Sequence, residues 1–161
     1  MLLGIISDTH GHVANTLAAV RMLESLSVDE VLHCGDIGSP EIPRLLARWP
    51  THFVFGNCDP NEAELRLAIA SAGLLCHGRF ADLTLDGRRI AIVHSDDARL
   101  FRSTIAGGDY DLVCYGHTHQ AEQHREGKTL VLNPGALYRA NPHSLAIVDL
   151  PTLEATIIPL D

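Results

Sequence analysis

The chain has 161 residues, 46% of them hydrophobic, and a formal net charge of −8. This length fits a single domain, residues 1–161, whose core buries roughly 70% of the unfolded chain's surface without help from disulfides. The acidic balance argues against tight binding to long nucleic acid, because affinity for the phosphate backbone depends on Lys and Arg. A small phosphorylated substrate stays compatible with this charge if metal ions supply the positive charge.

The first half of the chain alternates strands and helices. The apolar run Leu2–Ile6 predicts a buried strand, because it is too short for a membrane span and lacks the basic residues that begin a signal peptide. The elements expected after it are a helix over Asn15–Leu26, a strand over Val31–His33, a helix from Ser39-Pro40, a strand over His52–Phe55 and a helix over Glu62–Ala72. This βαβαβα order predicts parallel strands with crossover helices.

The second half of the chain changes character. Phe80–Leu85 and Arg88–Val93 predict a hairpin around Asp86-Gly87, and a helix over Asp97–Ala106 follows. The last strands expected are Leu112–Tyr115, Thr129–Leu132, Ser144–Asp149 and Ala155–Ile158. Because short turns join them, we expect a second sheet that is largely antiparallel or mixed. An α/β fold of two packed sheets with helices outside accounts for the nearly continuous apolar strands.

Cysteine and histidine usage indicates a compartment and a chemistry. The four cysteines are Cys34, Cys58, Cys76 and Cys114. None forms a CxxC pair, so we interpret them as reduced thiols of a cytoplasmic protein. We also expect no membrane association, because the apolar run Leu2–Ile6 is too short to span a membrane. Histidine occurs 10 times, and this excess directs attention to metal ligands.

Polar groups follow six of the expected strands at the point where each strand ends. They are Asp8-Thr9-His10, Gly35-Asp36, Gly56-Asn57-Cys58-Asp59, His94-Ser95-Asp96, Gly116-His117-Thr118-His119 and Asn133-Pro134-Gly135. Ligands of α/β sheets bind beyond the carboxyl ends of the strands, so these groups can converge on one crevice. Carboxylate, imidazole and amide oxygen together suit Mn, Zn or Fe.

Each group alone has a common structural explanation. An isolated Asp8-Thr9-His10 is more often a turn or a helix N-cap, and Gly35-Asp36 or Gly56-Asn57 can be an ordinary turn. His94 can be a hydrogen-bonded histidine at a strand end. The pair His117-x-His119 is the stronger metal signal. It also occurs in barrel amidohydrolases, but that barrel typically needs about 250 residues, and this chain is too short.

The combined set of motifs is far more specific than its parts. Its members are Asp8-x-His10, Gly35-Asp36, Gly56-Asn57-x-Asp59, His94 and Gly116-His117-x-His119. Together they resemble the calcineurin-like metallophosphoesterase superfamily, and the short Gly-Asn-Cys-Asp form resembles its small bacterial and archaeal phosphodiesterase branch. The resemblance spans essentially the whole chain. It implies a four-layer αββα sandwich with two central mixed sheets flanked by helices.

The resemblance also implies a mechanism and a ligand set. The chain would hydrolyse phosphodiesters, with monoesters left open, by attack of a hydroxide that bridges two metal ions. The first ion would be held by Asp8, His10, Asp36 and His119, and the second by Asp36, Asn57, His94 and His117. Asp36 would bridge them. We expect manganese first, with iron, zinc, nickel and magnesium as alternatives. The sequence leaves a homo-oligomer open.

The sequence departs from the wider superfamily at two positions. Ser95 stands where relatives commonly have Gly, and we expect its added Cβ to reshape the rim of the site without removing His94 from the metal. Cys58 stands where many relatives have a histidine that assists the phosphate or leaving group. The general acid is therefore open. His12 is one candidate, so that Asp36, Asn57 and His12 form the expected catalytic set, but His12 is equally well explained as an exposed loop histidine.

A second function class is a non-catalytic interaction scaffold on the same fold. A retromer subunit resembles such a scaffold, with an incomplete set of metal ligands. Here every expected ligand is present, which favours catalysis.

Overall fold

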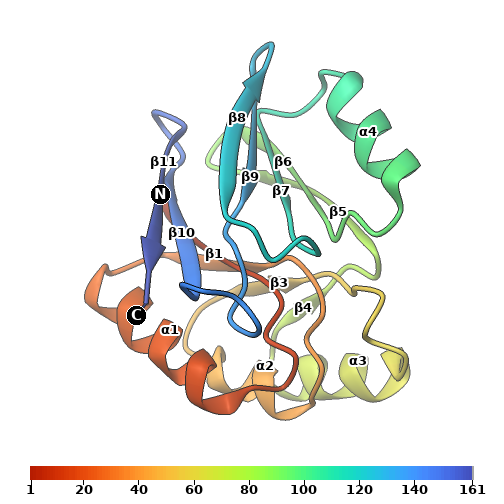
Figure 1. Cartoon of the computed structure of the whole chain (residues 1–161), viewed down its shortest axis with the longest axis vertical. Helices are drawn as coiled ribbons and strands as arrows, with labels where there is room; N and C mark the ends of the chain where they lie inside the picture. Colours follow the sequence, from red (N-terminus) through yellow and green to blue (C-terminus); the bar gives the residue numbers. More distant parts are fainter. Residues whose placement is uncertain (161) are drawn as a thin grey trace.

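A computed structural model describes residues 1–160 and contains two mixed β-sheets packed together, with helices on their outer faces (Figure 1). The α/β sandwich expected from the sequence and from the resemblance is therefore confirmed. Within the described residues, no helix has the length and apolar character needed to cross a membrane.

The first sheet contains the strands of the first half of the chain together with its last two strands. Its spatial order is β11 (Glu154–Pro159), β10 (Ser144–Asp149), β1 (Leu2–Ile6), β2 (Glu30–His33), β3 (Thr51–Phe53) and β4 (Leu75–Cys76). The strands from β1 to β4 pair in parallel, as the alternation of strands and helices predicts. β1 is buried along nearly its whole length, which explains why its sequence is continuously apolar.

Three helices cover the outer face of this sheet (Figure 1). They are α1 (Val13–Ser25), α2 (Glu41–Leu45) and α3 (Glu62–Ser71). Leu23, Ile42 and Ile69 from these helices belong to one apolar cluster with Ile6 and Phe53 of the strands. This packing fixes the positions of the loops that leave β1, β2 and β3.

The second sheet contains the hairpin and the strands that follow it. Its order is β5 (Phe80–Leu85), β6 (Arg88–Val93), β7 (Leu112–Tyr115), β9 (Thr129–Asn133) and β8 (Glu122–Glu126). β6, β7 and β9 are parallel, and the two edge strands are antiparallel to their neighbours. α4 (Ala98–Ala106) lies over its outer face and contributes Ile105 to a cluster with Val113 and Val131. Leu3, Ile90 and Leu132 belong to the cluster between the sheets.

The structure corrects the expected strand membership. β10 and β11 were expected in the second sheet, but β10 pairs antiparallel with β1 and extends the first sheet. The physical reason is that β1 is buried and needs a hydrogen-bonding partner on both edges, while chain order supplies only β2. β4 and β8 were not predicted. β4 has two residues, and β8 is too polar and exposed for a strand pattern.

The helix starts also differ slightly from the expected ones. α1 begins at Val13 with His12 as its N-cap, earlier than the expected Asn15. α2 begins at Glu41 with Pro40 as its N-cap, slightly later than the start at Ser39-Pro40 that the sequence predicts.

Glycines let the two sheets approach closely where their strands end. A Cβ on Gly116, after β7, would collide with the Ser7 side chain and lie 2.7 Å from Oδ2 of Asp8, after β1. A Cβ on Gly35, after β2, would lie 2.6 Å from the His94 ring after β6. The loops after four strands therefore meet at a single place between the sheets.

Gly116→Ala should lower the free energy of unfolding by about 2 kcal/mol, because the added methyl overpacks this contact. Urea denaturation measures the change. Gly107→Ala is the matched control, since Gly107 caps α4 at φ −63° and its nearest neighbours lie at 3.4 Å. Equal stability of the two variants would contradict a tight contact at Gly116.

Candidate metal centre

Two buried carboxylates occupy the ends of neighbouring parallel strands. Asp8 follows β1 and is 0% exposed, and Asp36 follows β2 and is 2% exposed. Oδ2 of Asp8 accepts hydrogen bonds from the Ser7 hydroxyl (2.6 Å) and from the His117 backbone N–H (3.1 Å). Oδ1 of Asp36 accepts one from the Cys58 backbone N–H (2.8 Å). Each carboxylate is thus anchored through one oxygen, and its other oxygen faces the space between the sheets.

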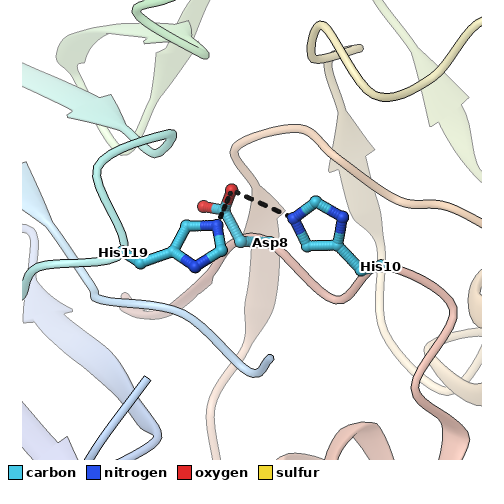
Figure 2. A group of neighbouring side chains, drawn as sticks. All are labelled: Asp8, His10 and His119. Carbon is cyan, nitrogen blue, oxygen red and sulfur yellow. Dashed lines mark ion pairs between the residues drawn. The ribbon is translucent and has the colours of Figure 1, made fainter. Parts of the chain in front are cut away.

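Three imidazoles face these remaining oxygens. Oδ1 of Asp8 lies 3.2 Å from Nε2 of His119 and 3.7 Å from Nε2 of His10, so that Asp8 stands between the two rings (Figure 2). Oδ2 of Asp36 lies 3.4 Å from Nε2 of His10 and 3.2 Å from Nε2 of His94. The first sheet supplies the carboxylates and His10, and the second sheet supplies His94 and His119.

Backbone carbonyls orient two of these rings. Nδ1 of His94 lies 2.8 Å from the Cys34 carbonyl, and Nδ1 of His119 lies 3.4 Å from the Arg139 carbonyl. A carbonyl only accepts, so Nδ1 carries the proton in each contact. In the neutral rings the Nε2 lone pair then points at a carboxylate oxygen. Metal-ligating histidines are commonly oriented by a hydrogen bond of this kind.

Several buried polar atoms of these groups have no hydrogen-bond partner within residues 1–160, and a cation between them would stabilise them. Oδ1 of Asp8 and Nε2 of His10 and of His94 are buried and have no hydrogen-bond partner among the described residues. Such unpaired buried groups are costly unless a cation binds them. Three clusters have ligand atoms within 4.8 Å of one another: Asp8–His10–His119, Asp8–Asp36–His94 and His10–Asp36–Cys58. Carboxylate and imidazole donors fit divalent transition metals.

The pKa values of these groups shift in the directions that mutual attraction predicts. Burial opposes the charge on Asp36, but contact with His94 outweighs it and lowers the pKa of the carboxyl to about 2. Contact with Asp8 raises the pKa of His10. Burial disfavours the charged form of His94, yet Asp36 outweighs it and the pKa of His94 is raised. In the metal-free protein the carboxylates thus favour protonated imidazoles.

Backbone strain concentrates at the candidate ligands. Positive φ angles occur at Asp8 (53°), His10 (44°), Asp36 (55°), His117 (75°) and His119 (58°). This left-handed conformation is unfavourable for residues other than Gly, and it persists where the surrounding structure enforces it. It turns the chain sharply after each strand so that the side chain returns toward the space between the sheets.

Asn57 and His117, the remaining candidate ligands, lie at the open side of the cluster. Both are exposed. The His117 ring lies 5.2 Å from the His94 ring, and Nδ2 of Asn57 lies 3.5 Å from Sγ of Cys58. Their assignment to a second ion stays a prediction.

His12 lies beside the cluster, where it caps α1. Its Nδ1 accepts a hydrogen bond from the Asn15 backbone N–H (3.3 Å), which leaves the proton of the neutral ring on Nε2. The ring stacks on Tyr138 at 5.6 Å, and Tyr138 also contacts the His10 ring at 5.5 Å. His12 therefore has a structural role, and its role as an acid stays a prediction.

Asp59 is a supporting residue whose function the sequence left undecided. It is 1% exposed and accepts hydrogen bonds from the backbone N–H groups of Ile37, Gly38 and Gly56. It thus ties the loop after β2 to the loop after β3. Its spacing in Gly-Asn-x-Asp was the available signal.

His33 is a core histidine whose two ring nitrogens both have hydrogen-bond partners. Its Nε2 lies 2.9 Å from the Thr9 hydroxyl and its Nδ1 accepts from the Gly35 N–H, while burial lowers its pKa to about 3. It is neutral, and its contacts with Thr9 and Gly35 hold the loops after β1 and β2.

Known proteins resemble this chain in sequence and in fold. Residues 1–152 match the calcineurin-like phosphoesterase superfamily domain. A phosphodiesterase of Methanocaldococcus jannaschii is 29% identical over 140 residues, which cover 84% of this chain and 83% of that protein. A solved archaeal phosphodiesterase superposes with a TM-score of 0.91 at 27% identity over 99% of both chains. Vacuolar protein sorting 29 of Cryptosporidium parvum shares the fold, with a TM-score of 0.68 at 19% identity over 98% of this chain and 95% of that one.

Uptake of a divalent cation by the metal-free protein should release protons, because the cation displaces those that the carboxylates hold on His10 and His94. Both imidazole pKa values are raised, so their stabilising contribution is complete below about pH 6.5 and is lost as the pH rises through the folded-state values. Metal affinity should accordingly increase with pH. Titration calorimetry in two buffers of different ionisation enthalpy counts the released protons.

His124→Ala is the control for this measurement, because His124 pairs with Glu122 on the exposed edge strand β8. It should release as many protons as the unmodified protein. Heats that do not depend on the buffer would contradict protonated imidazoles at the centre.

Proposed function

The chain belongs to the calcineurin-like phosphoesterase superfamily, and on that premise we propose that it is a metal-dependent phosphodiesterase with a dinuclear centre. One observation carries the proposal. Asp8 and Asp36 are each anchored through one oxygen, and their other oxygens face Nε2 of His10 and His94, which have no hydrogen-bond partner among residues 1–160. The archaeal relative named a phosphodiesterase supports diesters as the substrate class.

Asp36 is the proposed bridge between the two ions. Its Oδ2 lies 3.4 Å from Nε2 of His10 and 3.2 Å from Nε2 of His94, which are the imidazoles assigned to different ions. Two divalent ions, when bound, would neutralise phosphoryl oxygens and supply a nucleophilic water near neutral pH. The chain's own contribution is to orient the ligands. The Cys58 N–H donates a hydrogen bond to Oδ1 of Asp36 and leaves Oδ2 for the ions.

Substrate preference follows from the charge and the available acids. The protein has a net charge of −8, so the ions supply the positive charge that an anionic phosphodiester requires. His12 carries a proton on Nε2 when neutral and is the proposed donor to the leaving group. If His12 does not donate a proton, the reaction has no protein acid, and diesters with good leaving groups are then the preferred substrates.

Asp36→Asn should lower kcat/KM for an aryl phosphodiester by roughly 100-fold or more. Loss of a residue that only orients a metal ligand typically costs about 10- to 100-fold, and a direct ligand should cost at least as much. The loss should exceed that of any other single ligand substitution, since both ions depend on Asp36. Asp82→Asn, which removes an exposed carboxylate paired with Arg89, is the control. Near-full turnover of Asp36→Asn would refute the dinuclear scheme. An unmodified protein that is inactive with added manganese, zinc or ferrous iron would favour the scaffold alternative.

His12→Ala should slow substrates in proportion to how poor their leaving group is, because a proton donor matters most for a basic leaving oxygen. A series of aryl phosphodiesters with increasing leaving-group pKa measures this. The cap of α1 is lost too, so His12→Asn, which restores a good N-cap residue, separates stability from proton donation. Equal losses across the series would rule out His12 as the acid.

A further inference from the structure

Cys58 lies against the ligands assigned to the first ion. Its Sγ forms a cluster with a ligand nitrogen of His10 and a carboxylate oxygen of Asp36, all within 4.8 Å of one another. Nε2 of His10 is buried without a hydrogen-bond partner in the described chain. A thiol thus stands beside two of the groups that would hold a cation, at a separation that a single ion can span.

The position of Cys58 is set by its own backbone. Its N–H donates to Oδ1 of Asp36 at 2.8 Å, so the residue and the carboxylate are held together. Asp59, the next residue, is buried and accepts from the N–H groups of Ile37 and Gly56, which fixes the turn. Nδ2 of Asn57 lies 3.5 Å from the sulfur and can donate to it. A thiolate at this place would therefore be oriented and hydrogen-bonded.

The other cysteines lack such surroundings. Cys34 and Cys114 are fully buried in the apolar cluster between the sheets. Cys76 is half-buried on β4, with Sγ 3.7 Å from Arg66. Among the cysteines of residues 1–160, Cys58 alone shares a cluster with a carboxylate and an imidazole.

We propose that Cys58 is a further ligand of the ion held by His10 and Asp36, and that its sulfur shifts the metal preference of the centre toward zinc and ferrous iron. Sulfur is a soft donor that selects zinc and iron, whereas manganese and magnesium prefer oxygen. When the bond from sulfur to the ion forms, the thiol proton leaves to solvent. This inference rests on the proposed function, because it adds a ligand to the same centre.

Cobalt substitution tests the assignment directly. A cobalt ion with a thiolate ligand shows a sulfur-to-metal charge-transfer band in the near ultraviolet, in addition to the visible bands that report bound cobalt. The unmodified protein and the control Cys76→Ser should show both features. Cys58→Ser should keep the visible bands and lose the charge-transfer band, because its hydroxyl is a hard donor of similar size.

The outcomes separate this inference from the proposed function. Visible bands without a charge-transfer band in the unmodified protein, or a band that survives in Cys58→Ser, would overturn the sulfur ligand and leave the phosphoesterase proposal intact. Protein that takes up no cobalt would overturn both, since then the centre itself is absent.

Competition between zinc and manganese provides a second readout, independent of activity. In Cys58→Ser the ratio of zinc affinity to manganese affinity should fall by at least about tenfold. Loss of a residue that only hydrogen-bonds to a metal ligand typically lowers metal affinity by about 10- to 100-fold, and loss of a ligand should not have a smaller effect. Cys76→Ser should retain it. An unchanged preference in Cys58→Ser would contradict the proposal.

Discussion

Two buried negative charges at the ends of adjacent strands impose the constraint on which the rest of the site depends. Asp8 and Asp36 have almost no contact with water, so their charge has to be compensated by the protein or by a cation. Ser7, His117 and Cys58 donate hydrogen bonds to one oxygen of each carboxylate, Oδ2 of Asp8 and Oδ1 of Asp36. Imidazoles face the other oxygen of each. Three of the ten histidines, His10, His94 and His119, thus face the charge that the first sheet buries.

The two sheets make unequal contributions to this arrangement. The first provides both carboxylates, and the second provides His94 and His119, so the centre exists only where the sheets meet. Gly35 and Gly116 allow this approach because a side chain at either position would strike a residue of the opposite sheet. The ligands of the centre therefore come together only when the two sheets pack against each other.

The sequence predicted the local pattern well and the long-range pairing less well. Asp8, Asp36 and His94 could be placed because each follows an apolar run and strand ends converge in α/β folds. The pairing of β10 with β1 was not predictable, since it depends on which edge of a buried strand stays open. The anchoring by Asp59 and the position of the Cys58 sulfur were also hidden, because both depend on how a turn is folded rather than on its residue types.

The left-handed backbone at the ligand positions has an evolutionary consequence. Each such residue costs about 1 kcal/mol or more relative to a relaxed conformation, and glycine would relieve that cost. At the ligand positions a function of the side chain offsets that cost. In a duplicated gene copy released from that function, replacement of the exposed His117 by glycine or asparagine would relieve the strain and keep the backbone N–H that binds Asp8, so drift would erase a ligand while preserving the fold.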